Sequence, residues 1–300
     1  DTFGAMSVGY VPEFFGKFKK QLFPTIQFPV PNKYRVPKGM SLSDYQNDCL
    51  EKIEKRFSKK NNIAAFVMES GAQVAGGVIV YPKGFQQKIN QLCKKYNILF
   101  VLDEIATGFG RLGSMVQYTE QKSTPDIVAY GKMLTGGYIT MAATLTTKKI
   151  YDSFLGEFND WRHLFHGHTY TGNPLSAAVA NENLKMYQKY SLIKKIQKTS
   201  KIFERYYQEI SELDIVGDIR HKGMLMGIEL VSDKKKKSPI HPKKSINKIF
   251  FEQGKKQGIY LRTLGNIVML VPPLAISEKE LELLINRTIS TIKTAKSQLI

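Results

Sequence analysis

The chain has 300 residues, enough to bury a sizeable core and to form about two domains. Its hydrophobic fraction of 42% and charged fraction of 23% are ordinary for a globular protein, and no apolar run approaches the roughly 18 residues of a membrane helix. The only cysteines, Cys49 and Cys93, stand alone, which fits a reducing compartment. We therefore expect a cytoplasmic protein with no membrane partner. Because DTFGAMSV starts without a methionine, we also expect a preceding N-terminal segment.

The net charge of +18 raises the question of a nucleic-acid partner. Only 8 of the 44 basic residues are arginines, and the lysines are scattered along the chain, whereas recognition of bases and phosphates favours arginine. The densest run, Lys234 to Lys237, lies among serine and prolines and predicts a flexible loop. We expect no nucleic acid to be bound.

The regular elements begin with a helix over LSDYQNDCLEKIEKRF. Apolar strands are then predicted at 63–69, 99–104, 126–130 and 139–147. A helix between the first two strands carries an apolar face made of Phe85, Ile89, Leu92 and Tyr96. Apolar strands that alternate with helices indicate a sheet that is covered on both faces and at least partly parallel, so we predict an α/β fold.

The pattern of predicted elements changes near residue 190. A helix that starts at Asn173 and Pro174 is followed by a lysine-rich helix, a strand in GMLMGIELV and another helix from 244. Two strands flank Leu264 and Gly265, and a capping box starts a last helix whose apolar stripe holds Leu281, Leu284, Ile285, Ile289 and Ile292. We predict a large domain over residues 1–188 and a smaller α+β domain over residues 189–300.

An acidic pair, Asp103 and Glu104, ends the strand at 99–104, where open α/β sheets place their ligand sites. A carboxylate there is costly unless a cation meets it, although it can also simply cap the following turn. Lys132 follows the next strand between glycines; a partly buried lysine can become a nucleophile, while a surface lysine is the ordinary alternative. An acid and a lysine at neighbouring strand ends, 132 − 103 = 29 residues apart, are what a pyridoxal phosphate site needs.

The stretch GFGRLG at residues 108–113 satisfies the G-x-G-x-x-G pattern of dinucleotide-binding folds. No acid stands about 20 residues further on, where the ribose partner belongs. We therefore reject a dinucleotide site and expect these glycines to turn the chain away from the acid and the lysine.

Longer blocks carry a family resemblance. LDEIATGFGRLGSM, PDIVAYGKMLTGGYITMAATLTT, FHGHTYTGNPLSAAVANENL and YLRTLGNIVMLVPPLA resemble the class III (omega) aminotransferases over essentially the whole chain. Within the family they most resemble the branch that makes 7,8-diaminononanoate from 8-amino-7-oxononanoate in biotin biosynthesis. The resemblance implies fold type I of the pyridoxal phosphate transferases, with a mostly parallel central sheet flanked by helices.

The resemblance also implies the roles of the site residues. Lys132 would be the Schiff-base lysine, Asp103 the partner of the pyridine nitrogen, and Ile105 would pack against the ring face, unless it is a plain core residue. Gln73 matches the position near the phenolic oxygen, although a solvated loop glutamine is an alternative. Arg262 matches the arginine that grips the substrate carboxylate, against the alternative of a surface arginine.

The segment HGHTY has further implied roles. Gly167 would lie near the substrate, and His168 and Thr169 at the cofactor phosphate, reaching in from the other subunit of a homodimer whose active site lies at the interface. Many members have proline at the position of His168, and a subset has histidine. The nearby histidines lack a cysteine or a third fixed ligand, so we expect no metal. The family's N-terminal phosphate loop and substrate-holding aromatics are not in this chain.

The resulting prediction is a homodimeric aminotransferase with pyridoxal 5'-phosphate as cofactor and with a keto acid and an amino donor as small-molecule partners. The keto acid would be 8-amino-7-oxononanoate, and the donor S-adenosylmethionine or lysine. Another class III omega-aminotransferase or an aminomutase stays open as an alternative. A non-catalytic, basic nucleic-acid-binding protein is a second alternative from a different class.

Overall fold

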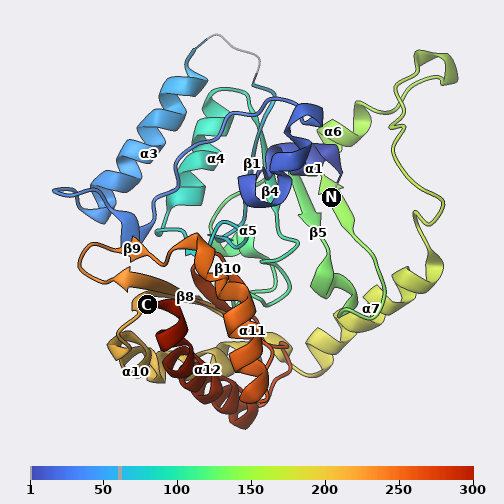
Figure 1. Ribbon diagram of the computed structural model, residues 1–300. Coiled ribbons are helices and arrows are strands. Elements are labelled where there is room, and N and C mark those ends of the chain that lie inside the picture. The colour runs from blue at the N-terminus through green and yellow to red at the C-terminus, as the bar shows by residue number, and fades with distance from the viewer. Residues whose placement is uncertain (1, 60–62) are drawn as a thin grey trace.

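The computed structural model describes residues 2–59 and 63–300. Two sheets organise the molecule, and the first lies above the second in Figure 1. In the described residues the first sheet has the order β1-β4-β5-β6, and its strands are Ala65–Glu69, Leu99–Asp103, Ile127–Tyr130 and Ala143–Thr146. β4 pairs in parallel with both β1 and β5, whereas β6 runs antiparallel to β5. The predicted strands and the mostly parallel α/β architecture are confirmed.

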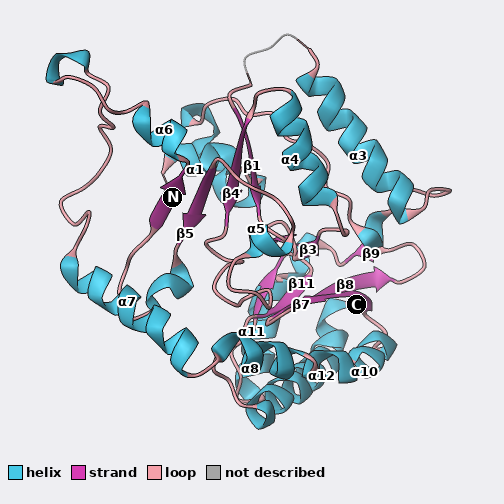
Figure 2. Ribbon diagram, turned by 180° about the vertical axis from the view of Figure 1, so that it is seen from behind, coloured by secondary structure: helices cyan, strands magenta, loops and turns pink. Residues whose placement is uncertain are grey.

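Helices α3 (Leu42–Phe57) and α4 (Phe85–Lys95) lie side by side next to the first sheet, and α7 (Pro174–Lys189) lies near β5 (Figures 1 and 2). The predicted face of α4 packs into the core. The same helix buries two polar residues, Gln86 and Asn90, which sequence patterning did not predict. Gln86 Nε2 donates to Ser70 Oγ at 3.0 Å and to Ser123 Oγ at 2.8 Å, so its burial leaves this donor satisfied.

The start of α7 is formed as predicted, because the Asn173 side chain accepts from the amides of Leu175 and Ser176 and Pro174 opens the helix. The free thiols of Cys49 and Cys93 are buried in α3 and α4. The remaining regular pieces of this part of the chain are short: α1 (Phe3–Val8), α2 (Pro12–Phe15), α5 (Gln117–Glu120), α6 (Lys148–Asp152), the 3-10 turns 16–21, 33–35, 132–135 and 158–160, and the strand pair β2 (Ala72–Gln73) and β3 (Ile79–Val80).

The second sheet has the order β10-β11-β8-β7, with antiparallel neighbours at Arg262–Leu264, Ile267–Leu270, Leu225–Asp233 and Val216–Lys222. A short strand, β9 (Ser238–Pro239), pairs with β8. Strand β7 was not predicted, because it carries Asp218, Arg220 and Lys222 and lacks the apolar alternation that marks a strand. Helices gather below this sheet in Figure 2: α8 (Leu192–Ser200), α9 (Ile202–Arg205), α10 (Tyr207–Glu212), α11 (Ile246–Lys256) and α12 (Glu278–Leu299).

The lysine run 234–237 makes the turn between β8 and β9. Two of its members make hydrogen bonds: Lys234 Nζ donates to the carbonyl oxygen of Ser211 at 2.8 Å, and Lys237 Nζ donates to the carbonyl oxygen of Tyr34 at 2.7 Å and lies 4.6 Å from the centre of the tyrosine ring. Lys237 thus ties the N-terminal segment to the second sheet. None of the described helices combines the length and the apolar character that crossing a membrane would demand.

The packing of α12 against the second sheet can be tested directly. Ile285 is fully buried on α12, whereas Leu283, two residues away on the same helix, is 48% exposed. We expect Ile285→Ala to lower the free energy of unfolding by about 2–5 kcal/mol, because the cavity it leaves loses packing as well as burial. Leu283→Ala is the matched control and should change it by no more than about 0.5 kcal/mol. Equal effects in chemical denaturation would contradict this packing of α12.

Candidate active site

The carboxyl ends of β1, β4 and β5 meet at one edge of the first sheet. Glu69, the last residue of β1, pairs in register with Asp103, the last residue of β4, and Asp103 pairs in turn with Ala129 of β5. Lys132 comes directly after β5 and Gly131. Parallel pairing therefore brings the acid and the lysine singled out from the sequence to the same edge.

Lys132 is exposed, which was the ordinary alternative for this lysine in the sequence analysis. It lies beyond the last paired residue of β5, where the sheet no longer covers it, and its backbone has a φ of +42°. A Cβ added to Gly131 would lie 3.3 Å from Ile105 Cγ2, so Ile105 packs against the backbone just before the lysine. Ile105 thus contacts the lysine's own segment from the neighbouring strand end.

The two members of the acidic pair behave differently. Asp103 Oδ1 accepts from the amide of Ile105 at 2.8 Å, and no hydrogen bond to its second oxygen comes from the described residues. Glu104 is fully buried, and its two oxygens accept from the amides of Gln117 and Tyr118 at 2.9 and 2.6 Å. Glu104 therefore caps the start of α5, the structural role weighed for this pair, while Asp103 keeps an oxygen available for a cation.

Glu69 is a member of this cluster that sequence reasoning missed. Both of its carboxylate oxygens lie 3.0 Å from the amide nitrogen of Val74, and this contact fastens the loop that carries Gln73. The available signal was an acid at the end of an apolar strand, the same signal that identified Asp103. Gln73 itself is half-buried, beside the strand ends.

The charges at this edge influence one another. Burial raises the pKa of the Glu69 carboxyl from its ordinary 4.5 to about 7; the Asp103 carboxylate adds to the rise, while the Val74 amide and the Lys132 ammonium oppose it. Both the Asp103 carboxylate and the Lys132 ammonium are therefore near enough to Glu69 to act on its carboxyl group.

The predicted phosphate-binding segment does not join these three residues within one chain. Gly167, His168 and Thr169 are exposed in the segment between α6 and α7, which extends away from the rest of the molecule in Figure 1. The amide of Tyr170 donates to His168 Nδ1 at 3.1 Å, and the amide of His168 to Thr171 Oγ1 at 3.0 Å. These contacts shape a local turn, and no described side chain from the sheet edge contributes to it.

Arg262 lies on β10, the edge strand of the second sheet, and is exposed. No ion pair or hydrogen bond engages its guanidinium among the described residues, so the planar fork is available to an anion.

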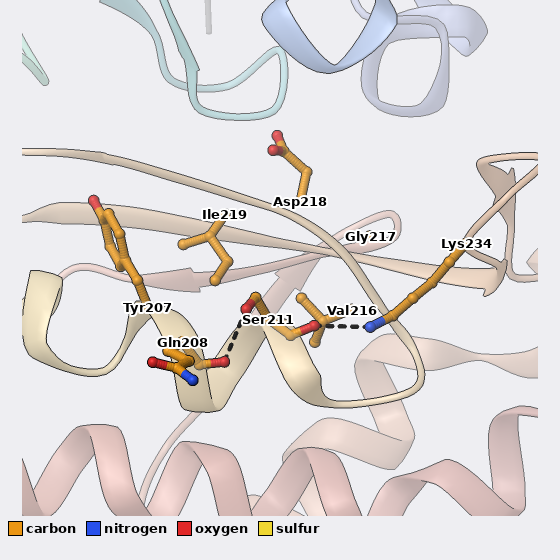
Figure 3. A pocket seen from close by; sticks show the side chains of 8 residues that line it. All are labelled: Tyr207, Gln208, Ser211, Val216, Gly217, Asp218, Ile219 and Lys234. Carbon is orange, nitrogen blue, oxygen red and sulfur yellow. Dashed lines mark hydrogen bonds between the residues drawn. The ribbon is translucent and has the colours of Figure 1, made fainter.

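A surface cavity of about 570 Å³ lies elsewhere, between α10 and β7 (Figure 3). The Asp218 carboxylate points away from the other side chains of this cavity in Figure 3, and Lys234 Nζ already donates to the carbonyl oxygen of Ser211 at 2.8 Å. Asp218 Oδ2 has no hydrogen-bond partner among the described residues, and the acid and lysine singled out from the sequence lie elsewhere, at the carboxyl ends of the first sheet.

Comparison with known proteins identifies the family of this chain. The model of the family "Aminotransferase class-III" matches residues 1–292. The chain belongs to the class-III aminotransferase family. A relative from Geobacter sulfurreducens, named adenosylmethionine-8-amino-7-oxononanoate aminotransferase, is 40% identical over 98% of this chain and 65% of its own length. This chain therefore spans 65% of the length of such curated relatives.

Solved structures agree in fold. The crystal structure of adenosylmethionine-8-amino-7-oxononanoate aminotransferase from Methanocaldococcus jannaschii superposes with a TM-score of 0.86 at 38% identity, over 98% of this chain and 65% of that one. The omega transaminase of Pseudomonas jessenii in complex with PMP gives 0.91 at 28% identity, over 99% and 66%. The class-III aminotransferase fold is thus shared over nearly the whole chain.

The unusual pKa of Glu69 predicts a pH dependence of stability. Because the folded-state pKa lies above the ordinary 4.5, the folded class-III aminotransferase binds this proton more tightly than the unfolded chain does. The resulting stabilisation is complete below pH 4.5 and disappears as the pH rises through 7. As the pH rises from 4.5 to 7 and above, we expect the free energy of unfolding of wild type to fall by about 3 kcal/mol relative to that of Glu69→Gln, because the glutamine cannot titrate. Denaturant unfolding without added cofactor measures this, and parallel pH profiles of the two proteins would refute it.

Proposed function

We propose that the protein is a pyridoxal phosphate-dependent aminotransferase that converts 8-amino-7-oxononanoate to 7,8-diaminononanoate. The observation that carries the proposal is the meeting of Lys132 and Asp103 at adjacent carboxyl ends of parallel strands. Pyridoxal phosphate supplies an electron sink for a substrate carbanion and carries the amino group between two substrates. S-adenosylmethionine and lysine are the two candidate donors, and the printed name of several relatives supports the first.

The residues of this edge fit the cofactor. The Asp103 oxygen without a hydrogen bond suits a protonated ring nitrogen, which would stay charged because the carboxylate faces it. Ile105, packed beside Gly131, offers an apolar surface to a ring face, and Gln73 on its fastened loop offers an amide to the phenolic oxygen. Lys132 provides the amine that holds the cofactor.

The same lysine then handles protons. When it is not bound to the cofactor, the Lys132 amine would be the general base that takes the proton from the substrate Cα and the general acid that delivers it to the cofactor carbon. Its exposed position at the strand end leaves it room to move between these tasks. Arg262 would bind the substrate carboxylate by a two-pronged hydrogen bond and so orient the reacting carbon.

We also propose that the chain divides into a large domain at 1–188 and a small one at 189–300. Two separate clusters of buried residues support the division: one draws on positions from Cys49 to Tyr187, the other on positions from Ile196 to Leu299. Partly buried residues such as Leu192 and Leu274 pack against both clusters, which suits two domains in firm contact.

A homodimer with its active site at the interface is the third part of the proposal. The extended segment between α6 and α7 exposes large aromatic side chains, with Trp161 66% and Phe165 72% accessible and their rings 6.2 Å apart. Apolar patches of this kind mark interaction surfaces. A second copy that covers the segment would bring Gly167, His168 and Thr169 to its own cofactor phosphate.

The role of Lys132 is tested by Lys132→Ala in the full-length protein. We expect loss of the visible absorbance that develops when pyridoxal phosphate is added, and loss of turnover, because no amine remains to hold the cofactor or move the proton. Lys279→Ala, at an exposed position of α12, is the matched control. Amine exchange is measured with 8-amino-7-oxononanoate and with pyruvate; turnover of pyruvate alone would favour another class III transaminase, and full activity of Lys132→Ala would overturn the assignment.

The dimer is tested by Phe165→Asp. Burial of an unpaired carboxylate in an apolar interface is costly, so we expect the dimer dissociation constant to rise about 100-fold or more. Leu283→Asp, at a similarly exposed apolar position on α12, should leave it unchanged. Light scattering over a concentration series gives both values. An unaltered dimer in Phe165→Asp would exclude the segment as its interface.

A further inference from the structure

The loop that carries GFGRLG joins the two sheets. It leaves β4 at Asp103 and returns at α5, and between these points it contacts the second sheet. Arg111 Nη1 donates to the carbonyl oxygens of Met224 at 2.8 Å and Pro272 at 2.7 Å. In return, the amide of Met224 donates to the carbonyl oxygen of Arg111 at 2.8 Å. One residue thus makes three hydrogen bonds between the sheets.

Next to these hydrogen bonds, the backbone at Gly223 lies directly against the backbone of the loop at Leu112 and Gly113. Gly223, the residue before Met224, has a φ of +58°, and a Cβ there would lie 2.4 Å from the carbonyl carbon of Leu112 and 2.5 Å from the amide nitrogen of Gly113. Any side chain at this position would push the loop off the second sheet. The position of the loop on that sheet is therefore closely defined.

The charge of Arg111 is unusual for a purely structural contact. Its side chain is buried with 8% of the residue exposed, and among the described residues its guanidinium forms no ion pair with a carboxylate. Burial lowers the pKa of the guanidinium to about 10, which leaves it protonated at neutral pH. A buried charge held by carbonyl groups alone is an inefficient source of stability compared with an apolar side chain, but its directed hydrogen bonds set a geometry.

The hydrogen bonds of Arg111 connect the two parts of the proposed site, the strand ends of the first sheet and Arg262 on the second. Met224 lies directly before β8, and Pro272 lies two residues past the end of β11. β11 pairs with β10, where Met269 stands opposite Arg262. At its other end the loop is tied to the first sheet, because the amide of Glu104 donates to the carbonyl oxygen of Ala129 in β5 at 2.9 Å.

We propose that Arg111 is a positioning residue, which fixes the carboxylate-binding Arg262 on the second sheet relative to Asp103 and Lys132 on the first. This inference rests on the proposed function. Without the Arg111 contacts, the second sheet would shift on the loop, and Arg262 would no longer hold a carboxylate at the correct place. Displacements near 1 Å are enough to cost about 100-fold in such arrangements.

The test uses two probes of equal length, the anion heptanoate and the neutral heptanamide. Both are added to the full-length protein loaded with pyridoxal phosphate. Calorimetry gives the dissociation constant of each probe for wild type, Arg111→Met, Arg262→Met and the double variant. We expect wild type to bind heptanoate more tightly than heptanamide. Arg111→Met should raise the dissociation constant of heptanoate about 10-fold or more and change that of heptanamide by less than about 2-fold. In the Arg262→Met background, Arg111→Met should change neither probe.

Three results would overturn the inference: equal weakening of acid and amide by Arg111→Met, an undiminished effect of Arg111→Met when Arg262 is already absent, and a wild type that shows no preference for the acid. A merely structural role predicts the first two. Should Arg111→Met fail to fold, the same four-protein series with Arg111→Lys applies, because lysine keeps the charge but not the fork between two carbonyls. Failure of the proposed function shows separately, as absence of amine exchange in wild type.

Discussion

Parallel pairing of β4 with both β1 and β5 is the constraint on which the candidate site depends. It sets the carboxyl ends of three strands at one edge, so that Glu69, Asp103 and Lys132 meet although they are far apart in the chain. The register has to be kept, because a slip of one residue would turn every side chain of a strand to the opposite face of the sheet. This register is held by burial: Phe100 and Leu102 of β4 and Val128 of β5 lie in one core with residues of α3 and α4.

Neighbouring carboxylates at the carboxyl ends of these strands repel one another and lose hydration, and the structure accommodates each of the three acids differently. Glu104 is satisfied by two amides of α5, and Glu69 is shifted toward its neutral form while it fastens the loop of Gln73. Asp103 keeps one carboxylate oxygen that accepts no hydrogen bond from the described part of the chain. This asymmetry suits the chemistry of a protonated heterocycle better than that of a metal, which would recruit several acids together.

The proposed site draws on three separately built parts: the strand ends of the first sheet, an arginine on the edge of the second, and an exposed segment offered to another copy. Their mutual placement depends on the surfaces between them. The loop around Arg111 is one such surface, and its hydrogen bonds fix direction as well as distance. A site divided in this way can change its substrate through one part while the others keep the reaction.

The sequence by itself determined the strands of the first sheet, the caps at Asn173 and Ser277 and the position of Asp103 and Lys132 at neighbouring strand ends, because apolar runs, capping residues and charges at strand ends are local signals. Only the tertiary structure decided the role of Glu69, the existence of β7, the exposure of Lys132 and the docking of the glycine-rich loop. These depend on which distant segments pack together: β7 is held by its pairing with β8 despite its polar residues, and Gly223 is needed only because another backbone lies against it. Contacts between distant residues leave no periodic trace in a single chain, which is the physical reason for the difference.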